Sequence, residues 1–62
     1  MNTIELNETQ EAELRRLKQY FPYRIVYAYL DKDNGDFHAN AVHTMAKPNN
    51  LSRKGHTVFL LK

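Results

Sequence analysis

Apolar residues recur at two different spacings, and the change of spacing divides the chain. From Asn7 to Phe21 they recur every three or four residues, which is typical of an amphipathic helix. The positions along its narrow face, with one polar member, are Leu6, Gln10, Leu14, Leu17 and Phe21. From Arg24 onward, runs rich in β-branched and aromatic residues predict strands instead.

Both ends of the helix carry sequence signals. Asn7 is a good N-cap, and Gln10, three residues later, can complete a capping box. Acidic residues in the first turns and basic residues in the last complement the helix dipole. Pro22 disfavours a helical conformation at Phe21, so the helix ends there. Before it, "TIEL" (3–6) alternates and predicts a short strand or a lead-in.

The stretch "RIVYAYLDKDNGDFHANAV" predicts a β-hairpin, because Asn-Gly is a strong turn signal. Two registers compete. A two-residue Asn-Gly loop sets Asp33 opposite Asp36, whereas a three-residue loop ending at Gly35 sets Lys32 opposite Asp36. Opposite charges across the strands favour the three-residue loop.

That register assigns the hairpin residues to two faces. One face, expected to lie under the helix, holds Ile25, Tyr27, Tyr29, Phe37, Ala39, Ala41, His43 and Met45. The other holds Val26, Ala28, Leu30, His38, Asn40, Val42 and Thr44. Since the first strand is apolar on both faces, one helix leaves half of its apolar side chains uncovered.

The rest of the chain is expected to form a long loop and a final strand. Pro and Asn in "AKPNNLSRKG" (46–55) predict the loop. "HTVFLLK" (56–62) is apolar on both faces and predicts the third strand. The predicted fold is therefore α+β, a single small domain over residues 1–62. One N-terminal helix packs on a three-stranded antiparallel sheet, in the order helix, strand, strand, strand.

The uncovered face predicts a surface that binds another protein, because contiguous exposed apolar area usually marks an interface. Its candidate partner-binding residues are Val26, Ala28, Leu30 and Val42. Open strand edges offer a second route to association. On this interpretation Val26→Glu abolishes association and leaves the monomer folded. The alternative is that the N-terminal segment or the long loop folds across this face.

Length and composition favour the same function. A chain of 62 residues buries about 60% of its unfolded surface, so a disulfide, a metal or a partner usually adds stability. The absence of Cys excludes disulfides and thiolate metal sites. No signal peptide or membrane span is evident, which favours the cytoplasm. We predict a non-catalytic inhibitor or modulator of a larger protein, phage- or mobile-element-like in style, whose partner is that protein or a second copy (homodimer).

Charge distribution supports an alternative function, nucleic-acid binding. Residues 1–13 hold four Glu and no Lys or Arg, whereas residues 14–62 hold nine Lys or Arg against three Asp. Such asymmetry is typical of chains that contact acidic partners. The candidate contacts, centred on the basic loop 47–56, are Arg15, Arg16, Lys47, Arg53, Lys54 and His56.

No metal site or cofactor is predicted. In "DKDNGD" an EF-hand register counted from Asp31 puts Gly35, Asp36 and Val42 at positions where the motif requires an acid, Gly and Glu. His38 and His43, five apart on a strand, face opposite sides and cannot share a metal.

The stretch "GHTVF" (55–59) resembles the Gly-Ser-His-His-Val-Phe stretch of HicA-type mRNA interferases, which are also short chains with a helix against a three-stranded sheet. The second His of that motif is Thr57 here. The resemblance implies a second alternative function, RNA cleavage. In it His56, beside Arg53 and Lys54, would act as the base on a 2′-hydroxyl.

Overall fold

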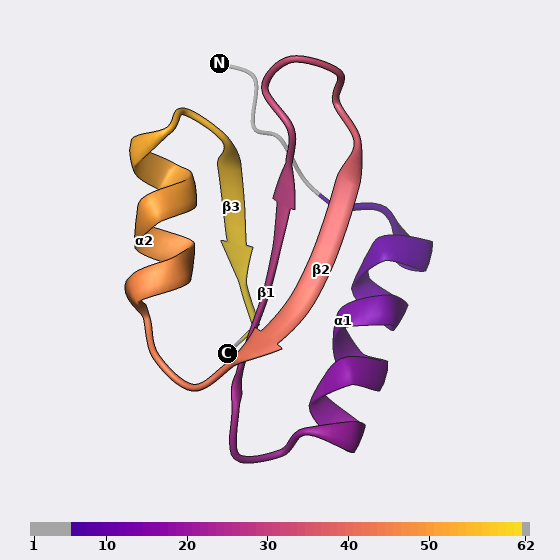
Figure 1. The fold of residues 1–62 in the computed structure, drawn as a ribbon. Coiled ribbons are helices and arrows are strands. Elements are labelled where there is room, and N and C mark those ends of the chain that lie inside the picture. The colour runs from indigo at the N-terminus through magenta and orange to yellow at the C-terminus, as the bar shows by residue number, and fades with distance from the viewer. Residues whose placement is uncertain (1–5, 62) are drawn as a thin grey trace.

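A helix, a β-hairpin, a second helix and a last strand follow one another along the chain. The computed structural model describes residues 6–61. Its elements are α1 (Glu8–Tyr20), β1 (Ile25–Leu30), β2 (Phe37–Val42), α2 (Ala46–Arg53) and β3 (Thr57–Leu60). The antiparallel sheet has the order β2-β1-β3, so β1 is central (Figure 1). The predicted α+β class is confirmed. Of the predicted lead-in, residues 3–5 lie outside the described residues.

Helix α1 begins and ends as its sequence signals predict. The backbone N–H of Asn7 donates to Gln10 Oε1 at 3.0 Å, and the N–H of Gln10 donates to Asn7 Oδ1 at 2.8 Å, which completes the capping box. Phe21 caps the other end, with its N–H donating to Leu17 O at 2.8 Å. The narrow face buries Leu14, which is 3% exposed, against the sheet.

The register of the hairpin differs from both predicted registers. Leu30 lies opposite Phe37, and the N–H of Asp31 donates to Asp36 O at 2.9 Å. The loop between Asp31 and Asp36 therefore has four residues, 32–35. The predicted pairing of Lys32 with Asp36 is wrong by one position.

Side-chain hydrogen bonds within the turn account for the longer loop. Asp31 Oδ1 accepts hydrogen bonds from the N–H groups of Asp33, at 2.7 Å, and Asn34, at 3.4 Å. Asn34 Oδ1 accepts one from the N–H of Asp36, at 2.9 Å. Gly35, at φ +75°, turns the chain back. Asp31 and Asn34 thus stabilise this turn by accepting hydrogen bonds from backbone N–H groups two or three residues later, rather than by pairing charges across it.

The same turn makes stability depend on pH. The N–H of Asp33, with smaller contributions from Asn34, His56 and His38, holds the pKa of the Asp31 carboxyl below its ordinary value of 3.8. Because the folded state lowers this pKa, the stabilisation is present above about pH 4 and is lost as the pH falls through the folded value. We expect the free energy of unfolding to decrease less on acidification in Asp31→Asn than in the wild type, by urea denaturation at several pH values.

The matched control is Asp33→Asn, which removes one carboxylate from the same turn. If both variants lose stability on acidification exactly as the wild type does, the hydrogen bonds of Asp31 do not contribute to it.

The observed register reverses the predicted faces of β1, because a shift of one residue moves each side chain to the other side of the sheet. Val26 and Ala28 pack under α1 in one cluster with Leu14 and Ala41. Tyr27 and Tyr29, expected under α1, face the other way, so this prediction is wrong. Tyr27 is nevertheless 1% exposed, and burial raises the pKa of its phenol above the ordinary value of 10.0.

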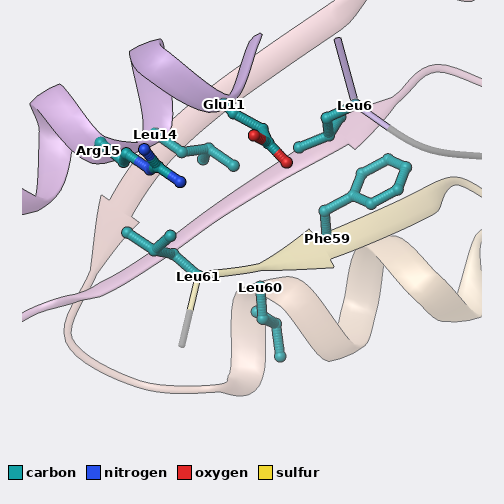
Figure 2. Close-up of a pocket in the computed structure, with 7 residues that line it drawn as sticks. All are labelled: Leu6, Glu11, Leu14, Arg15, Phe59, Leu60 and Leu61. Carbon is teal, nitrogen blue, oxygen red and sulfur yellow. The ribbon is translucent and has the colours of Figure 1, made fainter. Parts of the chain in front are cut away.

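The segment expected as a loop contains helix α2, so that prediction is also wrong. Pro48 lies in its first turn, where an α-helix needs no backbone N–H from the residue. Three residues later Leu51 follows on the same side, and both are buried. Figures 1 and 2 show α1 and α2 on opposite sides of the sheet. The strand β1 is apolar on both faces because a helix covers each face.

The end of α2 sets the direction of β3. The N–H of Gly55 donates to Ser52 O at 3.0 Å, and the N–H of His56 donates to Leu51 O at 3.2 Å. These two bonds, with Gly55 at φ +97°, form a Schellman motif. The chain therefore reverses within two residues and enters β3 beside β1.

Candidate protein-interaction surface

The four residues predicted to bind a partner do not form an exposed surface. Val26 is 1% and Ala28 0% exposed, because α1 covers them. Leu30 is half-buried on the same face, and Val42 is half-buried on the opposite face. The expectation that these side chains are uncovered is therefore wrong. The apolar area that appeared to need a partner is covered by α1 on one face and faces α2 on the other.

A different surface, with both apolar and charged side chains, is open between α1 and β3. A groove of about 480 Å³ lies there, lined by Leu6, Glu11, Leu14, Arg15, Phe59, Leu60 and Leu61. In Figure 2 the side chains of Phe59 and Leu61 point from β3 toward α1, whereas Leu60 points to the other side. Glu11 and Arg15 of α1 border the groove, so its margin carries one charge of each sign. We call this set of seven residues the β3 groove.

The β3 groove exists because α1 lies nearer to β2 than to β3 on its face of the sheet. The buried residue of α1, Leu14, belongs to one cluster with Ala39 and Ala41 of β2, the edge strand away from β3. The face of β3 is therefore only partly covered, and Phe59 and Leu61 remain half-buried. On the other face Leu60 is 43% exposed. The end of β3 thus presents apolar side chains on both faces.

The backbone of β3 is also available for pairing. The N–H of Leu61 donates to Val26 O at 3.1 Å across the β1–β3 register. Because bonding directions alternate along an antiparallel strand, Phe59 also bonds to β1, and Val58 and Leu60 direct their N–H and C=O groups away from it. Within the described residues β3 has no second neighbouring strand. It is an open edge beside the β3 groove.

The residues of the β3 groove were not among the predicted site residues. The apolar character of both faces of "HTVFLLK" was the available signal, but sequence alone does not show which face α1 leaves open. For α2, the signal was Arg53 and Lys54 followed by Gly55, a combination typical of a helix C-terminus. Pro48 and the two Asn residues after it favoured the loop interpretation.

His56, the residue shared with the interferase motif, is held in a small network on the α2 side of the sheet. Its Nδ1 accepts a hydrogen bond from the N–H of Lys32 at 3.1 Å, which places the imidazole proton of the neutral ring on Nε2. The centroid of its ring lies 5.2 Å from that of Tyr29, which also stacks on His38 at 5.0 Å. These contacts join the hairpin to the start of β3. RNA cleavage by His56 stays a prediction.

The six candidate nucleic-acid contacts are divided between two sides of the molecule. Arg15 and Arg16 lie on α1, whereas Lys47 and Arg53 lie on α2. Lys54 caps α2 and His56 follows it. Since α1 and α2 lie on opposite sides of the sheet, the six residues do not form one surface (Figure 1).

Two other features, a metal-binding group and a membrane-spanning helix, are absent from the described part of the chain. Among residues 6–61, no three His, Cys, Asp or Glu side chains gather as a metal site would require. No helix in the same range has the length and apolar character to cross a membrane. The chain matches no protein-family model, no curated protein and no solved structure with which it was compared.

Proposed function

We propose that this protein is a small, non-catalytic binding protein that inhibits or modulates a larger protein through the edge of β3. The observation that supports this proposal is the β3 groove, which lies directly beside the open strand edge. A groove and an edge together suit an extended segment of another protein. Its backbone would pair with Val58 and Leu60, and its side chains would enter the groove on one face.

The chemistry of the groove limits what can enter it. Phe59, Leu61 and Leu6 provide an apolar surface, which favours a large apolar side chain at every second position of the segment. Glu11 and Arg15 at the margin favour a segment without strong net charge of either sign. The expected ligand is therefore a β-strand or an extended peptide that is apolar and nearly neutral.

Capture by the tagged protein from a bacterial lysate, with and without nuclease treatment, tests this function. In Leu60→Lys a charged side chain replaces an exposed apolar one at the edge, where lysine opposes strand pairing. We expect this variant to retain the fold and to reduce capture of the partner roughly tenfold or more. Tyr20→Lys is the matched control, because Tyr20 is 71% exposed on α1 and the charge change is the same.

Capture that is equal in the wild type, Leu60→Lys and Tyr20→Lys would place the binding site elsewhere and contradict the proposal.

Nuclease treatment identifies the second candidate, nucleic-acid binding. The observation that favours this candidate is the group of basic residues Lys47, Arg53 and Lys54 on α2 and its cap, followed by His56. Capture that nuclease abolishes, and that Leu60→Lys leaves intact, supports the nucleic-acid function instead.

A further inference from the structure

The two edges of the sheet differ in how well they are protected. Along β2, residues that bond to β1 alternate with residues whose backbone groups point away from β1. Because Asp36 bonds to Asp31, Ala41 directs its N–H away from β1. Asn40 Oδ1 accepts a hydrogen bond from that N–H at 2.8 Å, which occupies part of the β2 edge. The strand β3 contains no charged residue, Pro or Gly that would oppose pairing. An incoming strand therefore meets less resistance at β3.

The strand β3 itself has the properties expected of a strand that would pair with this edge. It is extended, it is apolar on both faces, and it carries no charge between Thr57 and Leu60. The margin of the adjoining groove carries one acidic residue, Glu11, and one basic residue, Arg15. Its charges therefore cancel, and two copies of this surface do not repel each other. A second copy of the chain fits the edge on these grounds. A small chain without Cys also gains most from such an added interface.

We infer that β3 pairs with β3 of a second copy, in antiparallel orientation about a two-fold axis at Phe59. This inference rests on the proposed function, because the second copy would occupy the same edge that the larger protein uses. In this register Val58 of each copy bonds to Leu60 of the other, and every outward N–H and C=O of these two residues is used. The two sheets join into one sheet of six strands.

Two observations select this register over its neighbours. A register centred on Val58 would pair Leu60 with His56, but the N–H of His56 already donates to Leu51 O at 3.2 Å. The register centred on Phe59 also brings the two Phe59 rings together on the α1 side, at the mouths of both grooves (Figure 2). Leu60 of each copy is covered on the opposite face.

Cysteine substitution tests the pairing directly, because the chain contains no Cys of its own. Across the two-fold axis the Phe59 positions form a non-hydrogen-bonded pair, with Cα atoms about 4.5 Å apart, within the range for a disulfide. We expect Phe59→Cys to form a covalent dimer on mild oxidation. In Leu60→Cys the two Cα atoms lie about 8 Å apart in this register, so that variant should stay monomeric on a non-reducing gel.

A second variant leaves Phe59 unchanged in case Phe59→Cys weakens the fold. Val58→Cys combined with Leu60→Cys places the cysteines in hydrogen-bonded pairs, about 5.5 Å apart, and should also give a covalent dimer. Circular dichroism checks that each variant is folded. Sedimentation equilibrium of the unmodified chain should give a dimer at high concentration, and Leu60→Lys should shift that equilibrium to the monomer by roughly tenfold or more in concentration.

The outcomes separate this inference from the proposed function. A folded chain that stays monomeric at every concentration, or that cross-links equally through Phe59→Cys and Leu60→Cys, overturns the pairing with a second copy. If that monomer still captures a larger protein in a way that Leu60→Lys abolishes, the proposed function stands without the dimer. If the dimer forms as described, excess untagged chain should compete with the captured protein for the same edge.

Discussion

Val26→Glu is expected to unfold the protein, not to release a folded monomer from its partner. Val26 is 1% exposed and packs in the cluster that holds α1 on the sheet. An unpaired carboxylate at this position costs several kcal/mol of desolvation, or must stay protonated. A domain of 62 residues has roughly 3–9 kcal/mol of total stability, so this single change removes most or all of it.

Circular dichroism and thermal denaturation measure this effect. His43→Glu is the control, because His43 is exposed just after β2 and should tolerate the charge. We expect a cooperative transition in the control and none in Val26→Glu. A folded Val26→Glu that no longer binds its partner would restore the interface interpretation that the sequence alone suggested.

Leu14→Ala is expected to produce the second largest loss. Leu14 is 3% exposed and is the buried residue of α1 that contacts the sheet. Truncation of a buried leucine costs about 2–5 kcal/mol, through lost burial and the cavity that remains. Because α1 has a narrow apolar face, few other contacts can compensate. Urea denaturation should show a large decrease in the midpoint, with much of the protein unfolded before urea is added.

Tyr20→Ala provides the comparison on the same helix, since Tyr20 is 71% exposed. Its free energy of unfolding should stay within about 0.5 kcal/mol of the wild type. Equal midpoints for Leu14→Ala and the wild type would mean that α1 is not held on the sheet by this residue.

Local signals predicted the parts of the fold that depend on neighbouring residues. The capping box of Asn7 and Gln10, the end of α1 before Pro22 and the strand character of β1 were all readable. The hairpin register could not be predicted in this way. Asp31 and Asn34 accept hydrogen bonds from backbone N–H groups of the turn, and rules for pairing residues across strands do not include such bonds. A shift of one position then exchanged the two faces of β1.

The candidate site depends on tertiary packing, so most of it could not be predicted from the sequence. Sequence reasoning correctly found that β1 is apolar on both faces, but assigned one face to a partner because α2 was not foreseen. The β3 groove arises from the position of α1 over β2 rather than over β3. No periodicity in the sequence encodes that lateral position, so Leu6 and Phe59 could not be brought together in advance.

The long sequence separation between β1 and β3 has a consequence for folding. Tyr27 in the centre of the sheet pairs with Leu60, which lies 33 residues later in the chain. A partly folded chain that has formed only α1 and the hairpin leaves one edge of β1 bare. Such an edge is a template for aggregation among neighbouring chains. The rate at which β3 joins β1 therefore affects how much protein reaches the folded state.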